Sequence, residues 1–277
     1  MAYIEKRPIN RSKARVFCGH IYFTIKKYLQ WWFSFKRYTS VRSKDYYEKV
    51  IFSHNTPLYR KLKDVEMYLQ ENKVENLKIA ISKLDGIVIM PGQHFSYWKL
   101  IGRPTYRKGY KDGMILTAKG GFEEGVGGGL CQLSNLIYWM TLHTPLKVVE
   151  RYRHSHDVFP DAKRTQPFGT GATCYYNFLD LEIKNESNVP FQLRLWLTDS
   201  MLNGEWLSTV DLNYKYEVYE KEHIITSGFY GEYIRHNTIY RKKINELGEE
   251  IEDEYITENH AFMMYQPFLE SNIYEKV

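Results

Sequence analysis

Residues 125–160 read GVGGGLCQLSNLIYWMTLHTPLKVVERYRHSHDVFP, and this stretch determines both the expected fold and the expected site. It begins with the glycines Gly127–Gly129, which weaken regular structure and are typical of a sharp turn or a close backbone approach. A helix is predicted directly after them, because apolar residues recur there at spacings of three and four: Leu133, Leu136, Ile137 and Met140. Pro145 ends this helix, and residues 146–150 are predicted to form a buried strand.

Cys131 lies in the first turn of the predicted helix, and its thiol is a candidate nucleophile. Unpaired N–H groups and the positive end of the helix dipole stabilise an anion there, so the pKa of the thiol should be depressed. The same N–H groups would stabilise the oxyanion of a tetrahedral intermediate. A P-loop is excluded, because no Lys and Ser or Thr follow Gly129 in the required register. The residues expected to bind substrate or the oxyanion are Gly127, Gly128, Gly129, Gln132, Ser134 and Arg151.

A thiolate nucleophile needs a base within hydrogen-bond reach, and two histidines downstream are candidates. His154 and His156 lie two residues apart, so both point to one face if the chain stays extended. A strand beside the cysteine helix would then place one imidazole at the thiol. His143 lies roughly 18 Å from Cys131 along the same helix, so it is interpreted as a residue that complements the helix dipole. Either Asp157 or Asp161 would orient the imidazole, and the spacing specifies neither.

Cys131 has a second interpretation, as a small core residue, because free cysteines are among the most often buried residues. Cys18 and Cys174 are both interpreted as packing residues, and three cysteines form no disulfide framework. A zinc site of Cys131, Cys174 and the two histidines lacks the close paired spacings of structural sites. We therefore expect no metal ion, and thiol acyl transfer needs no organic cofactor.

Composition indicates a globular protein, since 43% of the 277 residues are hydrophobic and 26% are charged. The expected class is α+β, with the Cys-bearing helix packed on a mixed or antiparallel sheet. The N-terminus is expected to be helical and the C-terminal extension β-rich. The expected domains are a basic, aromatic, helical region at 1–72, a core domain at 73–200 and a β-rich extension at 201–277.

Other elements follow from periodicity and turn residues. A helix is predicted at 74–85, capped by Gly86 in the left-handed conformation. A hairpin turn is predicted at Asn203–Gly204. The Glu-rich stretch 246–258 is predicted to be a solvated face or loop. The further predicted strands are 87–90, 114–117 with a return strand, 173–178, 181–184, 191–198, 205–212 and 224–229.

The N-terminal arm carries the positive charge of the chain. Residues 1–42 hold ten basic residues and one acid, Glu5, a balance of +9, so the other 235 residues carry −4 of the net +5. Residues 16–35 are aromatic, but Lys26 and Lys27 interrupt them, so neither a cleavable signal peptide nor a transmembrane helix is recognised. The two interpretations are an interfacial helix in contact with anionic membrane through residues 1–42 and a helix packed on the main domain. The expected location is cytoplasmic or peripheral at the cytoplasmic membrane, with no nucleic-acid partner.

Four motifs of this chain together resemble the VanW family. They are P-G-x-x-F-S at Pro91–Ser96, G-G-G-x-C-Q-x-S at Gly127–Ser134, E-R-x-x-H-S at Glu150–Ser155 and G-x-x-A-T at Gly169–Thr173. The resemblance covers roughly residues 74–195. It departs from the common pattern at Gly171, where many members carry Asp.

The resemblance implies a protein associated with glycopeptide resistance and the cell wall. Some members act as L,D-transpeptidases through the family cysteine, which matches Cys131 here. It implies a cysteine acyltransferase acting on peptidoglycan stem peptides or precursors. The alternative is a non-catalytic accessory protein that binds a precursor or a resistance partner at the membrane surface.

Overall fold

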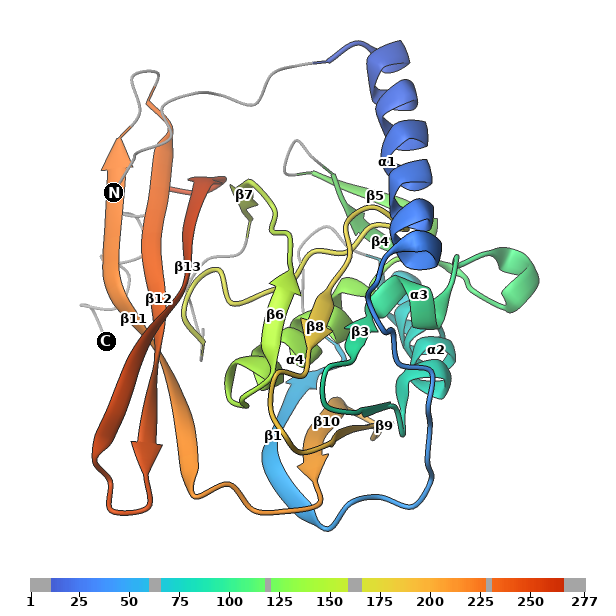
Figure 1. The fold of residues 1–277 in the computed structure, drawn as a ribbon. Helices are drawn as coiled ribbons and strands as arrows, with labels where there is room; N and C mark the ends of the chain where they lie inside the picture. The colour runs from blue at the N-terminus through green and yellow to red at the C-terminus, as the bar shows by residue number, and fades with distance from the viewer. Residues whose placement is uncertain (1–10, 60–65, 118–120, 159–165, 228–230, 267–277) are drawn as a thin grey trace.

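The computed structural model describes residues 11–59, 66–117, 121–158, 166–227 and 231–266. Helices and largely antiparallel sheets enclose one hydrophobic core, which confirms the expected α+β class (Figure 1). The helices are α1 (Lys13–Phe33), α2 (Met67–Leu84), α3 (Tyr97–Ile101) and α4 (Cys131–Leu142), with a 3-10 turn η1 (Tyr106–Lys108).

α4 packs on one face of the first sheet. Its strand order is β1-β10-β9-β2, and all neighbours are antiparallel: β1 (Lys49–Pro57), β10 (Met201–Ser208), β9 (Phe191–Leu197) and β2 (Val88–Ile89). The predicted turn at Asn203–Gly204 is wrong, because both residues lie inside β10 and the chain reverses before Met201. A Cβ on Gly204 would lie 2.7 Å from Cε of Met140, so this glycine allows α4 to approach the strand.

Two smaller sheets lie over the core beside α4. The strand order β3-β8-β6 joins β3 (His94–Ser96), β8 (Glu182–Lys184) and β6 (Lys147–Glu150), and β4 (Asp112–Leu116) pairs with β5 (Phe122–Val126). The predicted hairpin at 114–117 and its return strand are therefore present. The predicted strand at 173–178 is wrong, because this segment contains turns and isolated bridges only.

The C-terminal residues form a separate layer of long strands, at the left of Figure 1. Its order is β11-β12-β13-β7: β11 (Tyr214–Ser227), β12 (Tyr233–Asn245), β13 (Glu250–Met263) and β7 (His156–Asp157). The short β7 pairs in parallel with β13 and ties the chain after β6 to this layer. The Glu-rich stretch lies mostly in β13, whose first residues are exposed, so it is a solvated strand rather than a loop.

α4 is the central helix of the core. It contacts β1 and β10 of the first sheet and β6 of the second. Nine of its twelve residues are buried, and residues 136–142 are buried without a break, so the helix has little solvated surface. α2 begins earlier than the predicted 74–85, at Met67, and Gly86 follows it with a φ of 81° as expected.

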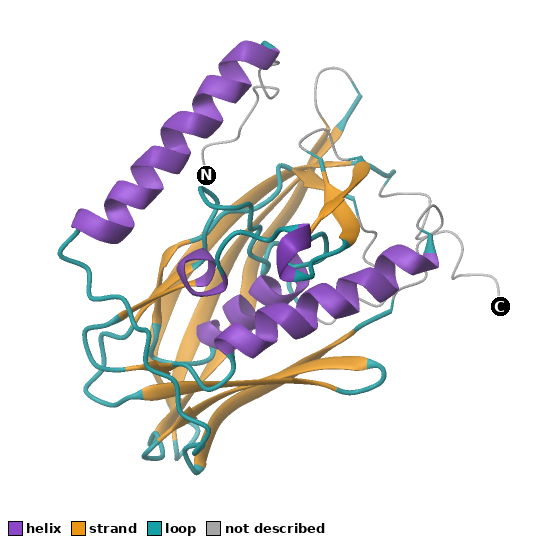
Figure 2. Ribbon diagram, turned by 90° about the vertical axis from the view of Figure 1, so that its right-hand side faces the viewer, coloured by secondary structure: helices purple, strands orange, loops and turns teal. Residues whose placement is uncertain are grey.

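α1 stands at the edge of the fold, and its upper half extends past the strands in both ribbon views (Figures 1 and 2). It is anchored by one buried cation, since Nζ of Lys27 lies 2.8 Å from a carboxylate oxygen of Glu150 and 2.8 Å from one of Glu182. Asp180 completes this cluster at 3.2 Å. Within the described ranges, no helix has the length and apolar character needed to span a bilayer.

Candidate active site

The glycine turn before α4 is held by a backbone-to-backbone contact. A Cβ on Gly128 would lie 2.1 Å from the carbonyl carbon of Gly113, so neither side of this contact has room for a side chain. The buried amide of Asn76 in α2 donates at 3.0 Å to the carbonyl oxygens of both Gly128 and Lys111. The turn thus sets where α4 begins.

The amide groups of the three glycines are already used inside the protein. The N–H groups of Gly127, Gly128 and Gly129 donate to the carbonyl oxygens of Lys111 (3.0 Å), Gly125 (3.0 Å) and Met114 (3.1 Å). They are therefore not free to bind an oxyanion in this conformation. In the part of the chain that the structure describes, the N–H groups of Leu130 and Cys131 donate to no acceptor. These two amides are the donors that the helix start offers.

Cys131 and Cys174 form a close thiol pair. Their Sγ atoms lie 3.4 Å apart, and Sγ of Cys131 also lies 3.4 Å from the carbonyl oxygen of Cys174. Cys131 is half-buried, whereas Cys174 is 8% exposed. Burial raises the pKa of Cys174 well above its usual value, and the neighbouring sulfur of Cys131 adds to this, so Cys174 keeps its proton.

The pKa of Cys131 is shifted in the opposite direction. The hydrogen bond from Cys174 is the largest cause that lowers it well below its usual value, and a hydrogen bond and charge interaction with His154 lower it further against the effect of burial. His154, and not a residue of α4, is thus the imidazole close enough to lower the pKa of the thiol. The sulfur has an imidazole neighbour and partial exposure, which a small core cysteine lacks.

Two segments that are distant in sequence bring these side chains together. The segment after β6 runs antiparallel to the segment that leads to Cys174, and the N–H of Thr173 donates to the carbonyl oxygen of Tyr152 at 2.8 Å. His154 and Cys174 therefore approach the start of α4 from adjacent chains. Cys174 is buried, as predicted for a packing residue, but its contact with Cys131 was not predicted. The only sequence signal for that contact is its place directly after the G-x-x-A-T motif.

Two residues expected to bind substrate or an oxyanion, Gln132 and Ser134, make contacts inside the fold. The amide of Gln132 donates to Thr56 Oγ1 (2.9 Å) and to the carbonyl oxygen of Pro57 (2.8 Å). The buried hydroxyl of Ser134 donates to the carbonyl oxygen of Ala172 at 2.7 Å. Both side chains hold neighbouring segments against α4.

Arg151 holds the loop of the G-x-x-A-T motif. Its guanidinium donates to the carbonyl oxygen of Gly171 at 2.8 Å and to that of Gly169, and it lies 4.9 Å from the ring of Tyr138. Gly171, where the motif departs from the family pattern, is thus part of this arginine contact. A Cβ at this position would lie 2.9 Å from Oδ1 of Asn135.

His156 lies in β7, and its contacts are Ser155 at 3.0 Å and the ring of Phe262. Burial lowers its pKa, and the neighbouring His154 lowers it further. The carboxylate of Asp157 accepts a hydrogen bond from Tyr265 at 2.8 Å and lies 3.3 Å from Arg235. Asp161 lies outside the described residues.

His143 ends α4 but does not complement its dipole as a cation. Its ring stacks on Phe52 at a centroid distance of 3.9 Å, and Nδ1 lies 2.9 Å from the carbonyl oxygen of Tyr216. Burial lowers its pKa to about 4, so the imidazole is neutral at neutral pH and the predicted role is wrong.

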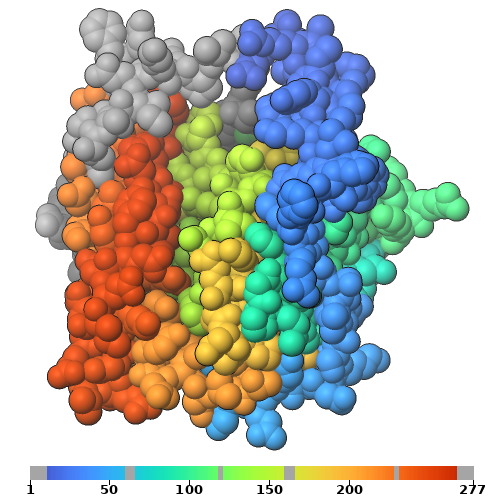
Figure 3. All heavy atoms as spheres, in the orientation of Figure 1, coloured from blue at the N-terminus to red at the C-terminus, as the bar shows by residue number. Residues whose placement is uncertain are grey.

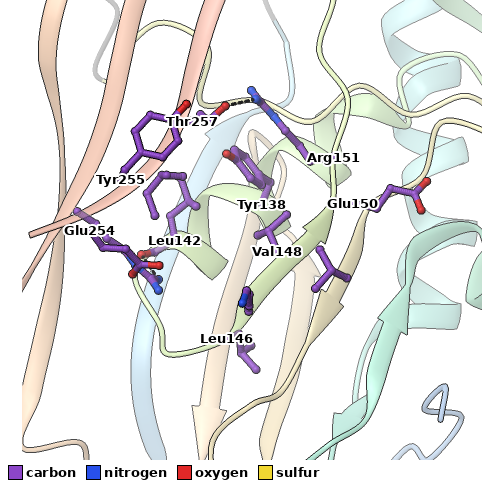
Figure 4. A pocket seen from close by; sticks show the side chains of 13 residues that line it. Tyr138, Leu142, Leu146, Val148, Glu150, Arg151, Glu254, Tyr255 and Thr257 are labelled. Carbon is purple, nitrogen blue, oxygen red and sulfur yellow. Dashed lines mark hydrogen bonds and ion pairs between the residues drawn. The ribbon is translucent and has the colours of Figure 1, made fainter. Parts of the chain in front are cut away.

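A cavity of about 330 Å³ lies between β6, α4 and β13, away from Cys131. Figure 4 shows Arg151 and Tyr138 on one side of it and Glu254, Tyr255 and Thr257 on the other, with Arg151 bonded to Thr257. Its lining combines charged residues with apolar ones. Within the described ranges, no group of three or more His, Cys, Asp or Glu side chains is arranged to hold a metal ion.

The motifs around this site are those of a known family. The family model described as VanW like protein matches residues 72–207, which include Cys131, His154 and Cys174. These residues belong to the VanW family.

Two curated relatives share the VanW region. The chain is 36% identical over 156 residues to the Vancomycin B-type resistance protein VanW of Enterococcus faecalis (strain ATCC 700802 / V583), covering 56% of each chain. It is 32% identical over 124 residues to the Uncharacterized protein YoaR of Bacillus subtilis (strain 168), covering 45% of this chain and 39% of the relative. The chain thus spans about half or less of these relatives. No solved structure matches it significantly.

Proposed function

We propose that this VanW-family chain is a cysteine acyltransferase of the L,D-transpeptidase kind, acting on peptidoglycan stem peptides or their precursors. The observation that carries the proposal is the half-buried sulfur of Cys131 at the start of α4, next to the Cys174 thiol and His154. A thiolate held at low pKa beside an imidazole is the arrangement that acyl transfer through a thioester requires. The name of the enterococcal relative supports a link with vancomycin resistance, which we extend to this chain.

In the first half-reaction, the Cys131 thiolate attacks the acyl carbon of the stem peptide and forms a C–S bond. The N–H groups of Leu130 and Cys131 donate to the oxyanion of the tetrahedral intermediate. The imidazolium of His154 gives its proton to the leaving amine as the C–N bond breaks, releasing D-Ala and leaving a thioester.

In the second half-reaction, an acceptor amine attacks the thioester and His154 takes its proton. The C–S bond then breaks, the acyl group passes to the amine, and the Cys131 thiolate is regenerated. Cys174 remains protonated throughout and donates to the thiolate whenever it is free. We assign Cys174 as a positioning residue, since it contacts the nucleophile and not the substrate.

The test is incubation of the purified chain with a disaccharide tetrapeptide and an acceptor amine, followed by mass spectrometry. We expect release of D-Ala, a cross-linked product and an acyl adduct on the peptide that contains Cys131. Cys131→Ala should abolish all three, whereas Cys18→Ala, which changes an exposed thiol on α1, should leave them unchanged. Product formation by the Cys131→Ala variant would refute the proposal.

The second candidate function is a non-catalytic accessory protein that binds a precursor or a resistance partner. The observation that favours it is the 330 Å³ cavity, which lies apart from the thiol and is lined by charged residues that include Arg151, Arg241 and Glu254. It predicts that Cys131→Ser leaves resistance unchanged in a host that depends on this chain, whereas the acyltransferase predicts its loss. The Cys131→Ser variant therefore distinguishes between the two candidate functions.

A further inference from the structure

The two faces of α1 have different partners. The inner face carries Lys27, buried among the carboxylates, and Trp31, which is packed against the core. Tyr28 extends this face, and its hydroxyl lies 2.7 Å from that of Tyr176. The helix therefore docks on the fold through positions spaced three and four residues apart.

The outer face of α1 is apolar. Each residue turns the helix by about 100°, so Tyr22, Ile25 and Leu29 lie roughly half a turn away from Lys27 and face away from the fold. Trp32 and Phe33 continue this face and are 67% and 76% exposed. The side chains that define the α1 outer face are Ile21, Tyr22, Ile25, Leu29, Trp32 and Phe33, all exposed.

This arrangement is the reverse of an ordinary surface helix, which buries its apolar stripe and exposes a polar one. A contiguous exposed patch of large apolar side chains is typical of a surface that binds a membrane or a protein. Figure 3 shows the N-terminal segment, in blue, at the upper right edge of the molecule.

Positive charges border the α1 outer face. Residues 11–42 contain eight Lys and Arg and no Asp or Glu. Lys27 and Lys36 are paired with buried carboxylates of the fold. The other six cations of residues 11–42 are exposed: Arg11, Lys13, Arg15, Lys26, Arg37 and Arg42.

We propose that the α1 outer face lies in the headgroup region of a bilayer that contains anionic lipids. Trp32 and Phe33 would enter the boundary between headgroups and acyl chains, while Lys26 and its neighbouring cations contact the lipid phosphates. A second copy of the chain fits this face poorly, because it would bring the same cations together without an acid of residues 11–42 to pair with them. The charge of the face complements an anionic surface.

The test is co-sedimentation of the full chain with vesicles of phosphatidylcholine, with and without phosphatidylglycerol. We expect binding only when phosphatidylglycerol is present, and weaker binding as salt is raised. The double variant Trp32→Ser, Phe33→Ser should weaken partitioning by roughly tenfold or more, since two aromatic side chains lose their apolar environment. Lys26→Glu should weaken it by roughly thirtyfold, since the contribution near an anionic surface is about 1 kcal/mol per unit of charge and the reversal changes the charge by two units.

Leu247→Ser is the matched control, because Leu247 is 83% exposed at the β12–β13 hairpin, on another part of the molecule. It should bind vesicles as the unchanged chain does. Unfolding curves of all variants should coincide, because the changed side chains are exposed. Equal binding to neutral vesicles, or no loss in the double variant, would overturn the proposal. A concentration-dependent dimer that the double variant abolishes would also overturn the proposal, because the α1 outer face would then bind a second copy of the chain.

Discussion

The Sγ atoms of Cys131 and Cys174 lie 3.4 Å apart, although 43 residues separate the two cysteines in the chain. Their environments are unequal, since Cys131 is half-buried and Cys174 is buried in the core. The two pKa values are consequently driven apart, that of Cys131 downward and that of Cys174 upward. The Cys131 thiol is therefore the more readily ionised of the two, and the protonated Cys174 thiol lies within hydrogen-bond distance of it.

Cys174→Ala should slow alkylation of Cys131 below neutral pH. Without the S–H donor the pKa of Cys131 rises, so less thiolate exists at pH 6, and the rate with iodoacetamide should fall by roughly tenfold. The rates should converge at high pH, where the thiol is ionised in both proteins. Cys174→Ser keeps a donor and should restore most of the reactivity, a rescue that simple loss of packing does not predict. A pH–rate profile identical to that of the unchanged chain would contradict this role.

Mild peroxide should link Cys131 and Cys174 by a disulfide. The Cys131 thiolate attacks hydrogen peroxide to give a sulfenic acid and hydroxide, and the Cys174 thiol then displaces water to form the S–S bond. The expected result is a loss of two hydrogens in the intact mass, with a cross-linked peptide that contains both residues and not Cys18. In Cys174→Ala, oxidation should instead stop at sulfenic or sulfinic acid on Cys131. A cross-link through Cys18 would show that the pair is not preferred.

Lys27→Met should destabilise the fold far more than Lys26→Met. The first change leaves Asp180, Glu182 and Glu150 without the cation at their centre, which costs about 3–5 kcal/mol when a buried pair is broken. The second changes an exposed neighbour, so an effect within about 0.5 kcal/mol is expected. Urea denaturation of the two variants measures the change in the free energy of unfolding that each substitution causes. Equal losses of unfolding free energy in the two variants would mean that the cluster around Lys27 does not stabilise the fold.

Asp180→Asn should change how stability depends on pH. Burial raises the pKa of Asp180 from 3.8 to about 6, so between these values the folded chain holds a proton that the unfolded chain has lost. The contribution of Asp180 to the free energy of unfolding is complete below pH 4. It falls by about 3 kcal/mol as the pH rises from 4 through 6. The difference in unfolding free energy between the variant and the unchanged chain should therefore grow in favour of the variant over this range. A difference independent of pH would refute the raised pKa.

Much of the local structure was predictable from short patterns. The apolar spacing after Gly129 predicts α4, and Gly86 adopts the positive φ that a helix end favours. The turn predicted at Asn203–Gly204 was wrong, because the turn propensity of this dipeptide is weaker than the pairing of a whole strand between β1 and β9. The strand predicted at 173–178 failed for a related reason, since its apolar residues pack as a loop beneath α1.

The sequence by itself determined the family, the class of fold and the position of Cys131 at a helix start, because these depend on residues close together in the chain. Only the tertiary structure decided which groups surround the sulfur. It brought Cys174 and His154 near the thiol and occupied the glycine amides with carbonyl oxygens of residues in and beside β4 and β5. Hydrogen bonds and pKa values depend on distances between atoms, and long-range packing sets those distances where no local pattern records them.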